Sequence, residues 1–322
     1  GQDYVSWTFR KQAGFFDVQT FTAESDQFVT VNHDLGCNIG AVIYKETSGT
    51  GDWYFWHKSF SENDIIRLNT TAAKQTAQGF ISSQTSSSAR FYTDANTTST
   101  YVAYFFGDGD DSNAQSFGDD SDESIIKCGS YTGTGSYTNP PVIDLGFEPQ
   151  FVIIKNASAS GDWLIGDIMR GATSQIIGSA GEAEILKANL SNAETSYSGG
   201  YIPISPTATG FTMSIDGSEG NASGKTYIYI AIRRPMKTPE AGTDVFAVDD
   251  AANGLTSGFP VDWFIRRTFS NSSNYAHTRL CGETFLTTDS TDAEQASSPS
   301  FDNNEGVFAQ LNNSAIYGWM FK

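Results

Sequence analysis

An internal repeat constrains this chain of 322 residues more than any other feature of its sequence. A block made of Asp-Leu-Gly, a run of β-forming residues and Gly-Asp-Trp occurs in residues 34–53 and again in residues 144–163. Its closing tryptophans, Trp53 and Trp163, lie 110 residues apart, and no gap is needed between the copies. Because a long repeat normally corresponds to one structural unit, the chain is predicted to contain the same folding unit more than once.

A second signature, which begins with tyrosine and is rich in β-forming residues, recurs four times. It occupies residues 4–9, 101–106, 229–234 and 317–321, and we align its occurrences by their first tyrosine. A third copy of the larger block is degenerate, since residues 258–275 lack an intact Asp-Leu-Gly and Gly-Asp-Trp. The sequence therefore leaves open whether the third copy folds or binds as the first two do.

Short apolar runs bounded by Gly, Asn, Asp, Ser and Pro dominate the chain, which is typical of strands joined by tight turns. We predict an all-β fold of tandem β-sandwich-like domains with few or short helices. Residues 49–52 and 156–162 are predicted hairpin turns that lead into the two repeated tryptophans. The best helix candidate is residues 179–190, with Ser179 as a possible N-cap, and residues 71–78 are a weaker one.

Composition shifts divide the chain into predicted domains. The first β repeat spans residues 1–107, an acidic linker spans 108–123, the second repeat spans 124–237, and the degenerate third spans 244–322. Residues 1–10 carry the signature that elsewhere closes a copy. We therefore expect them to be a strand that closes a preceding unit, which would make this sequence a window of a longer array, or a strand that completes this fold in trans.

The net charge of −18 excludes several classes of partner. A nucleic-acid-binding protein needs a cationic face that releases counterions from phosphates, so no nucleic acid is expected. Anionic membranes would repel this excess of carboxylates, and no stretch approaches the roughly 20 apolar residues of a membrane span, so no membrane insertion is expected. Cys37, Cys128 and Cys281 are widely spaced, and we expect buried single thiols rather than a disulfide framework.

The acidic linker contains the only cluster that resembles a metal site. Asp108, Asp110 and Asp111 could supply some of the six to eight oxygens that calcium takes. A solvated acidic linker is the alternative interpretation, because the helices and the twelfth-position Glu of an EF-hand are not evident. No cofactor is expected apart from a possible calcium ion.

The repeated Gly-Asp-Trp triplets are candidate glycan-binding positions. In such a turn the aromatic ring of Trp53 or Trp163 could stack on a sugar, while Asp52 or Asp162 accepts its hydroxyls. Trp56 is a further candidate, since aromatic side chains on alternating faces of one strand should include an outward one. The alternative is that each Asp shapes the turn and each Trp packs into the core.

The sequence contains no recognisable catalytic motif of the Gly-x-Ser-x-Gly or His-Glu-x-x-His kind. A pair of carboxylates for glycoside hydrolysis can come from distant strands, and 37 acidic residues do not nominate two. We therefore expect a protein that is not an enzyme.

Several stretches together carry a family resemblance. Residues 124–133, 144–150 and 229–237, with the opening residues 4–11 and 15–18, resemble a repeat domain of unknown function found in marine bacteriophage tail fibre and other virion structural proteins. The resemblance implies a virion protein, a homo-oligomer expected to be a trimer, and contacts with other virion proteins and with host surface polysaccharide. Two alternatives remain open, a virion-borne polysaccharide depolymerase and a bacterial surface adhesin.

Overall fold

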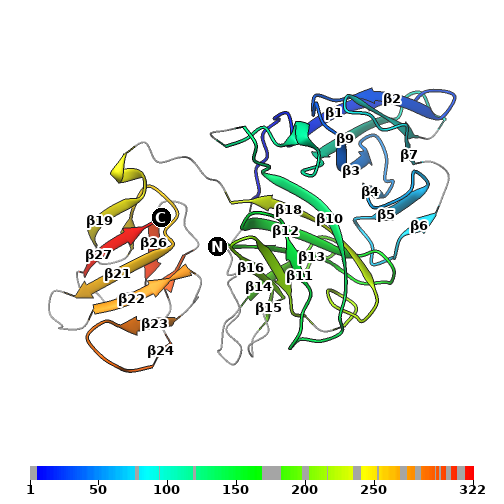
Figure 1. Cartoon of the computed structure of the whole chain (residues 1–322). Coiled ribbons are helices and arrows are strands. Elements are labelled where there is room, and N and C mark those ends of the chain that lie inside the picture. The colour runs from blue at the N-terminus through cyan, green and yellow to red at the C-terminus, as the bar shows by residue number, and fades with distance from the viewer. Residues whose placement is uncertain are drawn as a thin grey trace.

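The computed structural model of the chain is all-β, as the sequence predicts (Figure 1). It describes residues 6–76, 80–93, 95–118, 121–168, 183–197, 203–215, 217–234, 241–251, 254–268, 274–279, 284–293, 295–296, 299–301, 306–309 and 316–322. Within these ranges the structure describes two short 3-10 helices in full, η1 (Ser112–Ala114) and η3 (Gly242–Asp244). In this described part of the chain, no helix has the length and apolar character to cross a membrane.

The strands form three units, and each unit has a six-stranded sheet and a three-stranded sheet, which we call its large and small sheets. The large sheet of the first unit has the order β1 (Phe16–Thr22), β9 (Thr100–Gly107), β3 (Ile39–Glu46), β4 (Trp53–His57), β5 (Asp64–Arg67) and β6 (Gln75–Thr76). Its small sheet has the order β2 (Phe28–Asn32), β8 (Ser88–Tyr92) and β7 (Ile81–Ser82).

The second and third units repeat this plan. The large sheet of the second unit has the order β10 (Ile126–Thr132), β18 (Thr226–Arg233), β12 (Pro149–Asn156), β13 (Trp163–Asp167), β14 (Ala183–Lys187) and β15 (Thr195–Tyr197), and its small sheet has β11 (Val142–Asp144), β17 (Gly210–Met213) and β16 (Ile204–Thr207). The large sheet of the third unit has the order β19 (Phe246–Ala251), β27 (Ile316–Phe321), β21 (Trp263–Thr268), β22 (Asn274–Thr278), β23 (Thr284–Thr287) and β24 (Gln295–Ala296), and its small sheet has β20 (Leu255–Thr256), β26 (Gly306–Ala309) and β25 (Pro299–Ser300).

Corresponding strands occupy the same place in all three units, so the degenerate third copy has the topology of the other two. The third unit reaches it without an intact Asp-Leu-Gly or Gly-Asp-Trp. The spacing and alternation of apolar residues, rather than these motifs, therefore accounts for the strand order.

The last strand of each unit shows how the alternation builds two layers. In β9, Tyr101, Ala103 and Phe105 are buried in a core between the large and small sheets of the first unit, whereas Val102 and Tyr104 point to the other side. The second and third units have equivalent cores of their own, around Phe211 and Phe264 respectively. We call the side of a large sheet that is turned away from its small sheet the outer face.

The strand register corrects our alignment of the tyrosine signature. Phe16 pairs with Phe106, and the equivalent Ile126 pairs with Ile232, so Tyr101 corresponds to Tyr227 and not to Tyr229. A slip of two residues keeps every side chain on the same face, and the sequence alone does not reveal it. In the third unit the slip is one residue, so Gly318 takes the inward position of Ala103, where an added Cβ would lie 2.1 Å from Leu255 Cδ1.

The first and second units share a fourth core, which lies between their outer faces. The first unit contributes the buried residues Phe16, Ala41, Phe55, Ile66 and Phe106. The second unit contributes Ile126, Cys128, Ile153, Ala157, Trp163, Ile165, Ile228 and Ile230. Backbone contacts reinforce the junction, since the N–H of Lys74 donates to Ala157 O at 2.9 Å. These two units therefore form one packed body.

The segment before β1 covers part of this shared core. Residues 1–5 of the predicted closing strand lie outside the described residues, and residues 6–10 form no strand. Trp7 Nε1 donates to Asp167 Oδ2 at 3.1 Å, and the ring centroid of Phe9 lies 5.5 Å from that of Phe16. The signature residues in this segment thus act as a packed strap across both units.

The two helix predictions are wrong where the structure describes their residues. Ala183–Lys187 forms strand β14, and Gln75–Thr76 forms strand β6, while residues 169–182 and 77–79 lie outside the described part. In β14, Ile185 is fully buried in the core of the second unit, with the half-buried Glu184 and Leu186 on either side of it in sequence. Pairing with β13 and burial of Ile185 outweigh the local helix preference of this alanine- and glutamate-containing segment.

Candidate functional site

The two Gly-Asp-Trp triplets lie at corresponding hairpins, one between β3 and β4 and one between β12 and β13, as predicted. In the first hairpin, Asn69 Nδ2 donates to Asp52 Oδ1 at 2.9 Å, and Asn69 Oδ1 accepts the backbone N–H of Trp53 at 3.1 Å. Arg67 forms an ion pair with Asp52 Oδ2 at 2.7 Å. We call this group of aspartate, asparagine and cation the hairpin clamp. The clamp uses the backbone of Trp53 and not its indole.

The second hairpin has the same clamp. Asn189 Nδ2 donates to Asp162 Oδ1 at 2.8 Å, Asn189 Oδ1 accepts the N–H of Trp163 at 2.8 Å, and Lys187 Nζ lies 2.8 Å from Asp162 Oδ2. Burial raises the pKa of Asp162, but the hydrogen bonds from Lys187 and Asn189 outweigh burial and hold the pKa below its ordinary value. In both units, therefore, the aspartate of the triplet shapes the hairpin.

The two tryptophan side chains differ sharply in their surroundings. Trp163 is 1% exposed within the shared core, where its ring centroid lies 4.8 Å from that of Phe55. Its Nε1 donates to the carbonyl of Arg67 at 3.1 Å, so the indole ties the second unit to the first. Trp53 is 36% exposed, because the second unit does not cover this end of β4.

Trp53 lies beside a second aromatic residue on the outer face of the first unit. The ring centroids of Trp53 and Tyr104 are 6.4 Å apart, and their planes lie within 20° of parallel. Lys45 pairs with Trp53 across the hairpin, and its ammonium group donates to Gly49 O at 3.0 Å. We call Trp53 and Tyr104 the aromatic platform. An exposed indole with polar neighbours is suited to stacking on the apolar face of a sugar.

Two of the predicted glycan-binding residues are turned inward, which corrects those predictions. Trp56 is 6% exposed in the core of the first unit and donates from Nε1 to Ser61 O at 3.2 Å. Trp163 is buried as described above, so neither indole can reach a glycan. Asp52 and Asp162 are held in their clamps, which leaves Trp53 as the candidate that the structure places at the surface.

A partly buried polar cluster adjoins the second hairpin. Lys187 Nζ lies 2.6 Å from Glu219 Oε1 as well as 2.8 Å from Asp162, and the hydroxyl of Tyr197 donates to Glu219 at 3.3 Å. One ammonium group thus sits between two carboxylates and helps to lower the pKa of Asp162. This arrangement supports the clamp, because Lys187 binds Asp162 and is itself held by Glu219.

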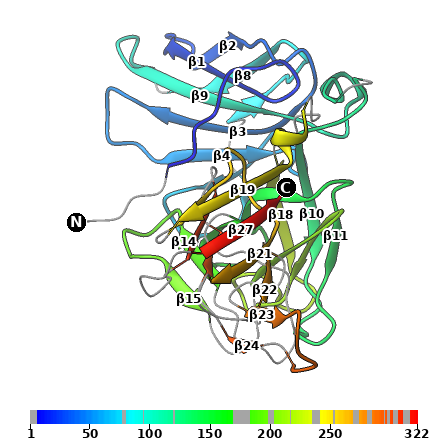
Figure 2. The same ribbon diagram turned by 90° about the vertical axis from the view of Figure 1, so that its left-hand side faces the viewer.

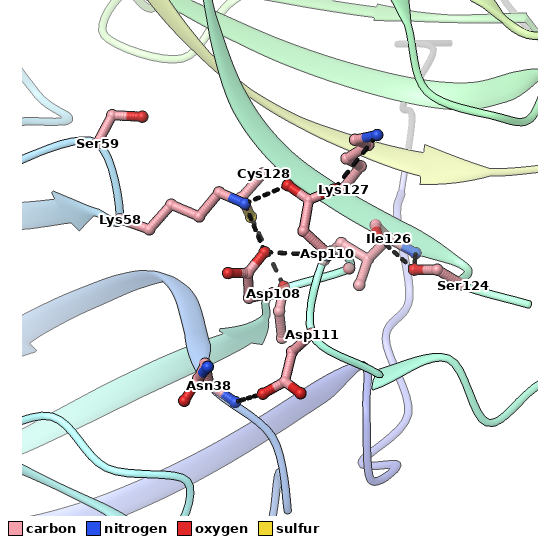
Figure 3. Close-up of polar contacts among 12 residues, drawn as sticks. Asn38, Lys58, Ser59, Asp108, Asp110, Asp111, Ser124, Ile126, Lys127 and Cys128 are labelled. Atoms are coloured by element: carbon pink, nitrogen blue, oxygen red, sulfur yellow. Dashed lines mark hydrogen bonds and ion pairs between the residues drawn. The ribbon is translucent and has the colours of Figure 1, made fainter. Parts of the chain in front are cut away.

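The predicted metal-binding aspartates lie at the junction of the first two units, where lysines already neutralise Asp108 and Asp110 (Figure 3). Lys58 Nζ lies 2.5 Å from Asp108 Oδ1 and 2.6 Å from Asp110 Oδ2, and Lys127 Nζ lies 3.3 Å from Asp110 Oδ1. Burial lowers the pKa of Lys58, but its two carboxylate partners outweigh burial and raise the pKa overall. Calcium would have to displace these ammonium groups.

Asp111, the third predicted ligand, is occupied by backbone donors. Its Oδ2 accepts the N–H of Asn38 at 2.7 Å, and its Oδ1 accepts the N–H of Asn113 at 3.0 Å as the N-cap of η1. These hydrogen bonds lower the pKa of Asp111. Among the residues that the structure describes, no group of three or more His, Cys, Asp or Glu side chains is arranged to hold a metal ion. The first part of the acidic segment is thus anchored to both units rather than freely solvated.

Cys37 and Cys128 are buried free thiols, as predicted, and Cys281 lies outside the described residues. Burial raises the pKa of Cys37 to about 11 and that of Cys128 further still. Both thiols are therefore protonated at neutral pH, and neither is suited to act as a nucleophile.

Sequence reasoning did not find the partners that decide these roles. Asn69 and Asn189 lie 16 and 26 residues beyond the tryptophans that they bind. The available signal was the cation-x-Asn pattern that Arg67-Leu68-Asn69 shares with Lys187-Ala188-Asn189. Lys58 and Tyr104 gave no signal, because they reach their partners only through the pairing of strands that are distant in the sequence.

A family model described as "Domain of unknown function (DUF7483)" matches residues 3–235, which is the strap together with the first and second units. No curated protein matches the chain.

Proposed function

The chain belongs to the family described as a domain of unknown function (DUF7483), and we propose that it is a non-enzymatic structural and adhesive protein of a virus particle, which binds a surface glycan through Trp53. The exposed side chain of Trp53 is the observation that supports glycan binding. The hairpin clamp is the same in both units, and it needs only the backbone of the tryptophan. The fold therefore does not explain why an aromatic ring stands exposed beside Tyr104.

The charge of the chain indicates which glycan to test. With a net charge of −18, the protein would repel acidic polysaccharides, so a neutral glycan is the expected ligand. Stacking on the indole requires only an apolar sugar face, which neutral hexoses and N-acetylhexosamines present.

The virion part of the proposal rests on the sequence resemblance to phage tail fibre and other virion structural proteins. The tandem β units support it, because repeated units packed through large apolar faces suit an extended, assembled particle component. A homo-oligomer that contacts other virion proteins is part of this proposal.

The chemistry of one pair of neighbouring carboxylates supports the absence of catalysis. Asp162 and Glu219 bind the same ammonium group, and the pKa of Asp162 is lowered. Glycoside hydrolysis needs one carboxyl group that stays protonated near neutral pH as the general acid. Asp162, with its lowered pKa, is not suited to that role.

The glycan-binding part is tested by titrating the full chain with neutral oligosaccharides and following tryptophan fluorescence. Wild-type protein should bind, and Trp53→Ala should weaken binding by about tenfold or more, because it removes the stacking surface. Val142→Ala, at a 74% exposed position on the small sheet of the second unit, is the matched surface control and should bind as wild type does. Equal binding by the Trp53 variant would contradict the proposal.

Two further observations separate the alternatives. Shortening of a host polysaccharide during incubation with the protein would favour a depolymerase over a binding protein. Mass spectrometry of purified virus particles should detect the chain, whereas detection only on bacterial cell surfaces would favour the surface adhesin.

A further inference from the structure

The outer face of the third unit is apolar and exposed. We call the group Phe246, Val248, Trp263, Ile265, Leu286, Trp319 and Phe321 the third-unit face. Val248 is 53% exposed, Leu286 is 52% exposed and Trp263 is 39% exposed. Isolated exposed apolar residues are normal on a protein, but a contiguous patch on one sheet face indicates a binding surface.

The strand register makes this patch continuous. Phe246, Phe321 and Trp263 are paired across β19, β27 and β21, and the ring of Phe321 lies 5.0 Å from Phe246 and 4.6 Å from Trp263. The next row consists of Val248, Trp319, Ile265, Ala276 and Leu286, one from each of five neighbouring strands.

In the first and second units the row equivalent to Val248–Leu286 is covered by the shared core. The row equivalent to Val248–Leu286 is Val18, Tyr104, Ile43, Phe55 and Ile66 in the first unit. In the second unit it is Cys128, Ile230, Ile153, Ile165 and Leu186. Every one of these ten residues belongs to the shared core or packs against it. The repeat therefore uses this face to join one unit to another.

In the third unit the equivalent face is turned away from the other units. The core around Phe264 consists of third-unit residues only, and the described link to the second unit includes an ion pair, with Arg234 lying 2.7 Å from Asp262. Figure 2 shows the large sheet of the third unit in front of the rest of the chain. Its outer face is thus open to a partner from outside.

We infer that the third-unit face binds the third-unit face of a second copy of this chain, sheet on sheet, in the way that the first and second units bind each other. The shared core shows that two outer faces of this repeat fit together, and a two-fold contact between copies needs one self-complementary patch. The next row of the face supports this pairing, because Asp250 and Arg267 flank Tyr317 on opposite strands. Two copies packed face to face can bring the acid of one copy to the base of the other.

The test measures the mass of the full chain in solution by sedimentation over a range of concentrations. Wild-type protein should associate reversibly. Val248→Asp and Trp263→Asp should each weaken the association by about a hundredfold or more, because each places an unpaired charge in the apolar contact. Both positions are exposed, so far-ultraviolet circular dichroism should show unchanged folding of the separated chains.

Trp53→Asp is the matched control, because Trp53 is 36% exposed on the outer face of the first unit and Trp263 is 39% exposed on that of the third. The control should associate as wild type does. A wild-type chain that stays monomeric, or an oligomer that ignores Val248→Asp and Trp263→Asp, would overturn the inference. So would an oligomer that Trp53→Asp dissociates.

This inference goes beyond glycan binding and can fail separately from it. Trp53→Asp should abolish binding of a soluble oligosaccharide and preserve association, whereas Trp263→Asp should do the reverse. Loss of oligosaccharide binding in the Trp263 variant would instead mean that the third-unit face is a ligand site, and it would contradict the pairing of two copies.

Discussion

At the scale of single residues, burial decides what each of two equivalent tryptophans does. Trp163 packs against Phe55 within the shared core and donates a hydrogen bond to the first unit, whereas Trp53 stands at the surface beside Tyr104. The backbone of each is bound by the same clamp. Because the clamp binds only the backbone, replacing either indole tests the packing of the side chain while the hairpin stays intact.

Trp163→Ala should lower the free energy of unfolding by about 3–5 kcal/mol, because it removes a large buried side chain and leaves a cavity between two units. Trp53→Ala should change it by about 1 kcal/mol or less, as at other surface positions. Denaturant unfolding of both variants, followed by circular dichroism, measures the difference. Similar losses in the two variants would show that Trp53 is also a packing residue.

His57 is a second residue whose position predicts a measurable property. Its side chain is fully buried at the junction of the first two units, with Nε2 3.2 Å from Tyr229 O and Nδ1 accepting the N–H of Ser59 at 3.1 Å. Both contacts suit the neutral ring with its proton on Nε2. Burial lowers the pKa of His57 from 6.5 to about 3, with smaller effects from its neighbours.

The lowered pKa of His57 predicts acid lability. The unfolded chain takes up the proton near pH 6.5 and the folded chain only near pH 3, so stability is full above pH 6.5 and falls as the pH drops from 6.5 towards 3. One such group contributes about 1.4 kcal/mol per pH unit at most. Unfolding of wild type and His57→Gln at pH 7, 5.5 and 4.5 tests this. The variant should lose less stability on acidification than wild type, and equal losses would exclude His57 as a source.

At the scale of elements, the hairpin clamp explains why the Gly-Asp-Trp triplet recurs. Each clamp satisfies a backbone N–H at the start of a strand and pairs the aspartate with a nearby cation. The two clamps differ in setting, because Asp162 and Lys187 are largely covered whereas Asp52 is 38% exposed in its side chain. Water can replace a lost hydrogen bond in the first clamp more readily than in the second.

Asn189→Ala should therefore destabilise the chain by about 1–3 kcal/mol, because it leaves the N–H of Trp163 and one oxygen of Asp162 without their partner in a covered site. Asn69→Ala is the matched variant in the open clamp and should cost about 1 kcal/mol or less. Thermal unfolding of the two variants gives the comparison. A larger loss of stability in the Asn69 variant would show that solvent exposure does not determine how much each clamp contributes to stability.

The elements also show how much the sequence could predict. Local turn residues and β-forming runs predict the hairpins that lead into Trp53 and Trp163. The large number of such runs along the chain predicts the all-β fold. The sequence predicts a helix where strand β14 forms, because pairing with β13 and the burial of Ile185 leave no local signal. The tyrosine signature was aligned two residues out of register in the second unit, since that slip preserves the alternation of faces.

The site was less predictable than the fold for a related reason. Repetition indicated correctly that the two aspartates have the same structural task, but it could not separate Trp53 from Trp163. Their difference depends on which face of which unit is covered, and that depends on packing between units. The same limit applies to Lys58, which reaches Asp108 and Asp110 across 50 and 52 residues of sequence.

At the scale of the whole molecule, the chain divides into two bodies, the first two units together and the third unit alone. The first two units share a core, and the family model covers both of them, from residue 3 to residue 235. The third unit has its own core around Phe264, and its described link to the second unit includes the ion pair between Arg234 and Asp262. Ion pairs at partly exposed positions contribute little to stability, so this link should couple the two bodies weakly.

Calorimetry of the full chain should therefore resolve two transitions, one for the first two units together and one for the third. Trp163→Ala should lower only the first, and Phe264→Ala, which removes a fully buried ring from the third core, should lower only the second by a comparable amount. Each variant thus removes a buried ring from one core and tests the stability of that body alone. If both variants shifted one common transition, the third unit would be part of the same cooperative body, and the polar link at Arg234 would have to carry far more coupling than its geometry suggests.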